Sequence, residues 1–358
     1  MERIIENQAA KLILEDGTVY TGHSFGYPIS IAGEVVFNTG MVGYPEALSD
    51  PSYYGQILTL TFPLIGNYGM PSADEINHLP QNYESGQGMI SALIVDDYSE
   101  DYSHWNAQLS LAQWLYNQKI PAISGIDTRA LTKKIREKGV MLGKVIISDK
   151  DVEFYDPNQT NLIEKVSINE PLFYGKSKKR VMLVDCGCKT SIITDMLERD
   201  VEIIRVPWNY PLGDEKVDGL LISSGPGDPK MAENTIVQVE TALRKDIPTF
   251  GICLGHQVMA LAVGSDTYKL KYGHRSQNQP VINEETQHCY ITSQNHGYAV
   301  ATEKLPQDWN NLFTNLNDGT CEGMIHKSGR FFSVQFHPEA SPGPVDTSFL
   351  FDQFAALL

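Results

Sequence analysis

Residues 247–257 read Ile-Pro-Thr-Phe-Gly-Ile-Cys-Leu-Gly-His-Gln, and this stretch decides the fold of the second half of the chain. A short apolar strand pattern ends in a Gly-Ile-Cys-Leu-Gly turn, and a helical pattern follows at 256–264. A nucleophile at such a sharp turn stands exposed above a sheet, and the flanking glycines let the backbone bend. The helix N-terminus favours a thiolate, and the N–H groups after it can stabilise an oxyanion. The pattern favours Cys253 as a nucleophile over its alternative, a small buried cysteine at a strand end.

The sequence on either side of this turn alternates between strand and helix patterns with short connections. Such alternation is typical of a doubly wound, mainly parallel sheet, in which ligands bind at the carboxyl ends of the strands. The predicted strands are 180–187, 201–208, 218–222, 248–252 and 330–336, and the predicted helices are 190–200, 234–246 and 256–264.

A second motif, Phe336-His337-Pro338-Glu339, follows the last of these strands. In an extended chain residues i and i+2 face the same side, and Pro338 biases His337 toward extended geometry. His337 and Glu339 can therefore point at one site as a base and the carboxylate that orients it, the Cys/His counterpart of a Ser-His-Asp triad. A lone histidine is more often structural, but the adjacent glutamate and the Cys253 turn reverse that expectation.

A third motif, Ser223-Ser224-Gly225-Pro226-Gly227-Asp228-Pro229, falls at a predicted strand end and is expected to border the same cleft. Its glycines can turn backbone N–H groups toward a substrate carbonyl or carboxylate. A plain Gly/Pro turn remains open on spacing alone.

The first half of the chain is predicted to be β-rich. Two short β-prone runs flank Asp16-Gly17 as in a tight hairpin, and further strands are expected at 33–40 and 56–62. Helices are expected at 103–119 and at 126–139, the latter with Asp127 or Thr128 as N-cap and Gly139 at its end. Periodicity weakens from 156 to 179, so we predict domains at 1–155 and 180–358 joined by a linker at 156–179.

Composition narrows the class of protein. The 358 residues carry a formal net charge of −16, which argues against a nucleic-acid partner. The sequence has no apolar run long enough for a membrane span and no signal pattern, so we expect a cytoplasmic protein without a membrane partner. The five cysteines are too few and scattered for a disulfide framework. Cys186 and Cys188 form a lone Cys-X-Cys, and the spacing of the remaining histidines predicts no metal site.

The three motifs together, in this order, resemble the class I (triad-type) glutamine amidotransferases over about residues 180–358. The resemblance implies hydrolysis of the glutamine amide through a cysteinyl thioester, with Cys253 as nucleophile, His337 as general base and acid, and Glu339 as the residue that orients it. It also implies an oxyanion hole from the backbone N–H groups of Gly225 and Leu254. Gln257 and Gly227 would help hold the glutamine.

The amino-terminal half resembles the domain that precedes the amidotransferase in small subunits of carbamoyl-phosphate synthetase. The resemblance is carried by 33–69 and 125–143, and by Gln-Asn-His-Gly-Tyr-Ala-Val at 294–300. It implies that Ser52 reaches the glutamine from the first domain. Asn295, Gly297 and Tyr298 would complete the glutamine site, although the family commonly has Phe where this chain has Tyr298.

The resemblance also implies a partner. The chain has no phosphate-binding loop and no region large enough to use ATP, so the ammonia would pass to a large synthetase subunit in a heterodimer. That subunit, not this chain, would use ATP, Mg²⁺ and bicarbonate to make carbamoyl phosphate for arginine or pyrimidine synthesis. The alternatives are another class I glutaminase subunit, which the amino-terminal domain disfavours, a catalytically inactive regulatory paralogue, and a stand-alone hydrolase of the same fold.

Overall fold

The computed structural model describes residues 8–148, 150–213 and 216–358. The chain divides into two compact units, Met1–Gln159 and Thr160–Leu358, each with its own core.

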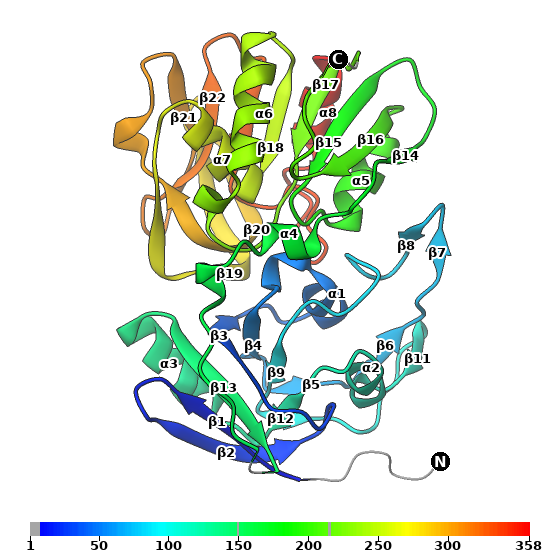
Figure 1. Ribbon diagram of the computed structural model, residues 1–358, viewed down its shortest axis with the longest axis vertical. Coiled ribbons are helices and arrows are strands. Elements are labelled where there is room, and N and C mark those ends of the chain that lie inside the picture. The colour runs from blue at the N-terminus through cyan, green and yellow to red at the C-terminus, as the bar shows by residue number, and fades with distance from the viewer. Residues whose placement is uncertain (1–7, 149, 214–215) are drawn as a thin grey trace. The chain divides into compact units, whose positions relative to one another are not determined.

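The first unit is built on a closed barrel with the strand order β1-β13-β3-β4-β9-β12-β2 (Figure 1). Its seven strands are β1 (Ala9–Leu14), β2 (Val19–Ser24), β3 (Ile31–Asn38), β4 (Gln56–Leu60), β9 (Ala92–Ile94), β12 (Ala122–Ser124) and β13 (Met141–Ile147). Closure pairs every barrel strand on both sides and leaves no open edge. The hairpin predicted around Asp16-Gly17 is confirmed, because β1 and β2 pair antiparallel with Leu12 opposite Tyr20.

Short elements join the barrel strands. The helices are α1 (Tyr44–Ser49), η1 (Pro51–Tyr53), α2 (Leu111–Asn117), α3 (Thr128–Lys138) and η2 (Pro157–Gln159). The remaining strands are β5 (Leu64–Ile65), β6 (Met70–Pro71), β7 (Glu75–Ile76), β8 (Leu79–Pro80), β10 (Asp97–Tyr98) and β11 (Ala107–Leu109). Their apolar side chains, including Leu48, Tyr53, Leu111 and Leu115, join Val36, Leu58 and Leu93 in the core of this unit.

Of the two helices predicted in this unit, one is confirmed and the other is shorter than predicted. α3 is confirmed together with its caps, since the Asp127 carboxylate accepts from the Ala130 N–H and Gly139 follows the last turn with φ 106°. The helix predicted over 103–119 is too long. Residues Ala107–Leu109 pair with β6 instead, and α2 begins only after Ser110, whose hydroxyl accepts from the Gln113 N–H. Strand pairing and this N-cap outweigh the helical spacing of the apolar residues.

The second unit holds a ten-stranded sheet in the order β14-β16-β15-β17-β18-β23-β22-β20-β19-β21. Five neighbouring strands run parallel: β16 (Glu202–Pro207), β15 (Arg180–Asp185), β17 (Gly219–Ile222), β18 (Thr249–Ile252) and β23 (Phe331–Val334). The others pair antiparallel: β14 (Leu172–Tyr174), β19 (Thr267–Asn283), β20 (Cys289–Val300), β21 (Trp309–Asn315) and β22 (Cys321–His326). The predicted parallel sheet is thus one half of a mixed sheet.

Helices cover both faces of the parallel half. Met182 and Val184 of β15 pack with Val239 and Val258, which come from α6 (Glu233–Arg244) and α7 (Leu254–Ala262). On the other face, Phe250 of β18 stacks with Phe332 and contacts Phe351 and Phe354 of α8 (Phe349–Ala356). The further helices of this unit are α4 (Ile163–Val166), α5 (Thr190–Leu197), η3 (Pro229–Met231) and η4 (Thr302–Lys304).

The segment predicted as a linker carries regular structure. Residues from Thr160 onward belong to the second unit, where α4 forms one turn and β14 extends the sheet by pairing antiparallel with β16. A three-residue edge strand and a single helical turn are too short to show the periodicity by which the sequence reveals longer elements.

Candidate active site

Cys253 lies at the turn between β18 and α7, as the sequence predicts. Its backbone has φ 55° and ψ −102°, and its N–H donates to the Val334 carbonyl at 2.8 Å. The two flanking glycines allow close packing. A side chain on Gly251 would meet the Gly255 carbonyl oxygen at 2.6 Å, and one on Gly255 would meet the Ile222 carbonyl oxygen at 2.4 Å. The turn is therefore pressed against β17, and Cys253 is the N-cap residue of α7.

His337 and Glu339 meet beside this turn. The Nδ1 atom of His337 lies 2.6 Å from Glu339 Oε1, and both side chains are buried. The backbone N–H of His337 donates to the Ser293 carbonyl at 2.9 Å, which fixes the residue against β20. Nε2 makes no hydrogen bond within the described residues, and Cys253 is near enough to affect the ionisation of His337. The imidazole thus has a carboxylate on one nitrogen and a thiol as its other polar neighbour.

A buried lysine extends this arrangement, and the sequence analysis missed it. Lys189 Nζ lies 3.1 Å from Glu339 Oε1 and donates to the Ala340 carbonyl at 2.6 Å. Lys189 is the N-cap residue of α5, after the carboxyl end of β15. That position was the one available signal, because polar residues after parallel strands gather at the ligand-binding edge of the sheet.

Charge balance at the site follows from these contacts. Burial alone would raise the pKa of Glu339, but the charges of Lys189 and His337 outweigh it and lower that pKa to about 2. Burial would likewise lower the pKa of His337, but Glu339 and Cys253 outweigh it and raise the pKa above its ordinary value. The carboxylate is therefore held ionised, and it favours an imidazolium beside the thiol.

The predicted glycine turn lies at the carboxyl end of β17. A side chain on Gly225 would meet the Cys186 carbonyl oxygen at 2.1 Å and the Leu254 side chain at 2.9 Å, so only glycine fits there. Gly227 has φ +87° and packs near Leu162. The structure thus brings Gly225 and Leu254, the two predicted oxyanion donors, next to one another.

The predicted residues of β20 also lie at this edge. Cys253 Sγ is 3.7 Å from the Asn295 carbonyl oxygen, so the strand passes beside the thiol. Gln257 Nε2 donates to the carbonyl oxygen of Tyr298 and to Gln335 Oε1, both at 3.0 Å. Gln257 therefore ties α7 to β20, and Gly297 lies between Asn295 and Tyr298 on the same strand.

Ser52 belongs to the first unit. It lies in η1, where its N–H donates to the Asp50 carboxylate at 2.9 Å, and its hydroxyl makes no hydrogen bond within the described residues. Its predicted role toward glutamine stays a prediction.

Cys186, Cys188 and His256 are buried, and each has a contact that serves the packing of the fold. Burial raises the pKa of Cys186 to about 12, and this thiol lies 3.8 Å from Thr235 Oγ1. Cys188 Sγ instead contacts the Lys189 carbonyl, so the Cys-X-Cys pair has separate partners. Burial lowers the pKa of His256 to about 3, and its Nδ1 bonds Ser333 Oγ at 2.8 Å.

Family models match both units. Residues 182–357 match "Glutamine amidotransferase class-I", and residues 12–145 match "Carbamoyl-phosphate synthase small chain, CPSase domain". The chain belongs to the carbamoyl-phosphate synthase small-chain family. Its β-rich first unit and its amidotransferase unit are the two parts of that family, as the sequence predicts.

The relatives that this chain matches are much longer proteins, and it spans about a quarter of their length or less. Human mitochondrial carbamoyl-phosphate synthase (ammonia) is 49% identical over 99% of this chain, which covers 24% of the human protein. The multifunctional protein CAD of Squalus acanthias is 51% identical over 96% of this chain, which covers 16% of that protein. Among solved structures, a glutamine amidotransferase of Thermotoga maritima matches 46% of this chain and 77% of its own, with 20% identity and a TM-score of 0.39.

Within the described residues, no helix combines the length and apolar character needed to cross a membrane.

Proposed function

We propose that this chain is the glutamine-hydrolysing part of a carbamoyl-phosphate synthase, releasing glutamate and ammonia from L-glutamine. The observation that carries the proposal is the buried chain of Cys253, His337, Glu339 and Lys189 at the carboxyl edge of the parallel strands. A thiol beside an imidazole that a carboxylate orients is the arrangement that nucleophilic acyl transfer requires. Lys189 keeps Glu339 ionised and in place.

In the proposed reaction the Cys253 thiolate attacks the side-chain amide carbon of glutamine. The N–H groups of Gly225 and Leu254 stabilise the oxyanion, and His337 protonates the leaving ammonia. A water molecule, deprotonated by His337, then attacks the thioester and releases glutamate and the thiol. The glutamine is held by residues of the second unit: Asn295, Gly297, Tyr298, Gln257 and Gly227.

The ammonia passes to a synthetase part that uses ATP, Mg²⁺ and bicarbonate. Two observations support this proposal: the first unit matches the small-chain model, and the relatives extend far beyond the length of this chain. A thiol nucleophile must stay reduced, so the protein needs a reducing compartment. We infer that this compartment is the cytoplasm. A second candidate is an ammonia-dependent synthase without glutaminase activity, suggested by the name of the human relative.

Substitution of the nucleophile tests the proposal. Cys253→Ser is expected to abolish glutamate release from glutamine, because a hydroxyl at that turn lacks the nucleophilicity of a thiolate. In a complex with the synthetase part, synthesis supplied with free ammonia is expected to continue. Unchanged glutamate release by the variant would reject Cys253 as nucleophile, and a wild-type chain without glutaminase activity would favour the ammonia-dependent candidate.

Substitutions of His337 and Glu339 test whether the two residues have the proposed, different roles. His337→Asn is expected to be nearly as damaging to glutaminase kcat as Cys253→Ser, because it removes the proton carrier. Glu339→Gln is expected to be milder, since an orienting contact is partly replaceable. Small and equal effects at both positions would mean that the imidazole is not the base.

A further inference from the structure

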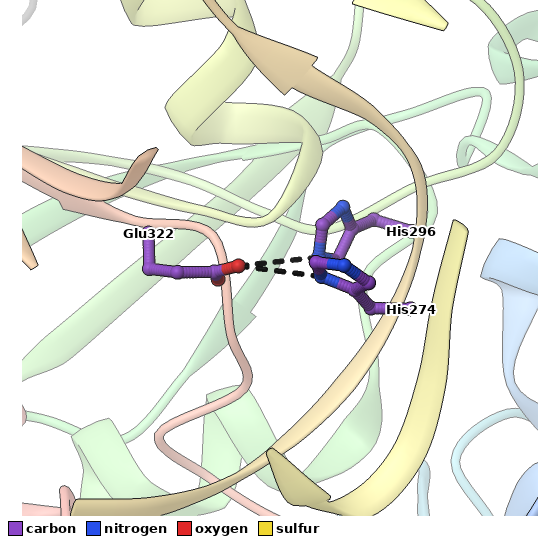
Figure 2. Close-up of side chains that lie close together, drawn as sticks. All are labelled: His274, His296 and Glu322. Carbon is purple, nitrogen blue, oxygen red and sulfur yellow. Dashed lines mark ion pairs between the residues drawn. The ribbon is translucent and has the colours of Figure 1, made fainter. Parts of the chain in front are cut away.

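Two histidines and a glutamate from three strands of the second unit meet in its interior (Figure 2). His274 comes from β19, His296 from β20 and Glu322 from β22, and all three are buried. One ligand atom of each lies within 4.8 Å of the others. Neither the proposed hydrolysis nor the sequence motifs assign this cluster a role.

In each imidazole, the ring nitrogen that faces away from Glu322 lies next to a hydrogen-bond acceptor. His274 Nε2 lies 2.8 Å from Asp318 Oδ2, and His296 Nδ1 lies 2.8 Å from the Tyr298 carbonyl oxygen. A carbonyl only accepts, so His296 Nδ1 carries a hydrogen, and in the neutral ring Nε2 then presents a lone pair.

The inward atoms are all potential acceptors. Glu322 Oε1 lies 3.4 Å from His274 Nδ1 and 3.9 Å from His296 Nε2. Gln294 Oε1 lies 3.0 Å from His274 Nδ1 and 3.1 Å from His296 Nε2. Glu322 is held by Asn315 and Thr320, which both approach its Oε1 at 3.2 Å, while its Oε2 makes no hydrogen bond within the described residues. Asn315 Nδ2 also lies 3.5 Å from His274 Nδ1, and a cation among these atoms would balance the buried lone pairs that face one another.

The spacing suits a small divalent ion. Ligands about 2.0–2.1 Å from a tetrahedral Zn²⁺ lie roughly 3.3 Å from one another, close to the distances found here. A ligating histidine usually donates its other N–H to a carboxylate or a backbone carbonyl, and Asp318 and Tyr298 supply one of each.

We propose that His274, His296 and Glu322 bind a Zn²⁺ ion, with Gln294 Oε1 as the fourth ligand. The ion would join β19, β20 and β22. Because Asn295 and Gly297 flank His296 on β20, the ion would also fix the strand that passes beside Cys253. The alternative to a metal ion is a second proton on the imidazole of His274, which would then donate a hydrogen bond from each ring nitrogen.

Cobalt titration tests the proposal on the full chain. The protein carries Cys253→Ser and Cys289→Ser, which remove the active-site thiol and the exposed thiol as metal ligands, and it is stripped with a chelator. We expect Co²⁺ to bind with the visible absorption of a tetrahedral site, and Zn²⁺ to displace it and raise the unfolding temperature. Absence of the absorption in the folded protein overturns the proposal and leaves the proton as the occupant.

Variants locate the site. Asp318→Asn is expected to weaken Co²⁺ binding roughly 10- to 100-fold, because it replaces the charged carboxylate that orients His274 with a neutral amide. Asp318 is partly exposed, so this variant is expected to fold. Asp346→Asn, an exposed carboxylate of the same unit, is the matched control and is expected to leave the affinity unchanged. His296→Gln is expected to abolish the absorption, and Co²⁺ binding that neither Asp318→Asn nor His296→Gln weakens would overturn the assignment.

Discussion

Cys253 has a backbone conformation that residues with a side chain seldom adopt. Its φ of 55° with ψ −102° lies outside the common regions, and such strain costs about 1–3 kcal/mol. The Val334 carbonyl and the close packing of Gly251 and Gly255 hold the residue there. Strain of this kind is common at functional sites, where it holds a reactive side chain in its working orientation.

Comparison of two inactive variants measures this strain. Cys253→Gly is expected to be more stable than Cys253→Ala by about 1 kcal/mol, because glycine adopts a positive φ without a Cβ clash and this gain exceeds its entropy cost. Urea unfolding of both proteins gives the difference. A Cys253→Ala protein that is equally or more stable contradicts a strained turn.

His337 links the stability of the fold to pH. Its pKa is raised in the folded protein because Glu339 and Cys253 outweigh burial. A raised pKa means that the folded chain binds a proton which the unfolded chain releases above its ordinary value of ~6.5. The stabilisation is therefore complete below that pH and is lost as the pH rises through the raised pKa.

His337→Asn removes this dependence. The stability of the wild type relative to the variant is expected to fall as the pH rises from about 7 to 9, with a slope of at most ~1.4 kcal/mol per pH unit. Urea unfolding of both proteins across this range measures it. Parallel pH profiles would mean that the folded imidazole binds no extra proton.

At the scale of the element, the contact between α7 and β17 positions the nucleophile. Gly255 lies in the first turn of α7, where a Cβ would come 2.4 Å from the Ile222 carbonyl oxygen of β17. That oxygen is backbone, so the helix must move to admit a side chain. A displacement of ~1 Å at a reacting group can cost on the order of 100-fold in rate.

Gly255→Ala is therefore expected to lower glutaminase kcat by at least ~10-fold and stability by about 1–3 kcal/mol. Gly86→Ala is the control, because its Cβ would meet no atom within 4 Å and its φ is not positive. The measurements are glutamate release and urea unfolding. Wild-type kcat in Gly255→Ala would show that α7 tolerates displacement from the sheet.

At the scale of the whole molecule, the chain covers 24% and 16% of the two relatives, and the proposed transfer of ammonia involves a synthetase part. A glutaminase that ran freely would waste glutamine whenever ATP or bicarbonate was absent. Control through the synthetase part avoids this loss, as conformational steps gate many active sites.

We expect the isolated chain to release glutamate slowly from glutamine. Addition of the synthetase part with bicarbonate and ATP is expected to raise the rate at least ~10-fold, because a modest repositioning of reacting groups has effects of this size. The measurement is glutamate release with and without partner and nucleotide. If the lone chain already reaches the rate of the complex, a self-sufficient hydrolase is the better interpretation.

The sequence by itself determined the features that depend on neighbouring residues. The turn at Cys253, the pairing of His337 with Glu339, the hairpin at Asp16-Gly17 and the capped helix α3 all follow from local propensity, periodicity and short spacing. The family resemblance likewise rests on local motifs, such as the turn at Cys253 and the His337-Pro338-Glu339 segment, and these can be read without the fold.

Contacts between residues far apart in the chain depend on the tertiary fold and not on local sequence. Lys189 reaches Glu339 from another strand end, and β11 forms because β6 lies beside it. The cluster of His274, His296 and Glu322 has no ligand spacing in the sequence and arises because three antiparallel strands bring those positions together. Such contacts depend on strand order and register, which local propensity does not specify.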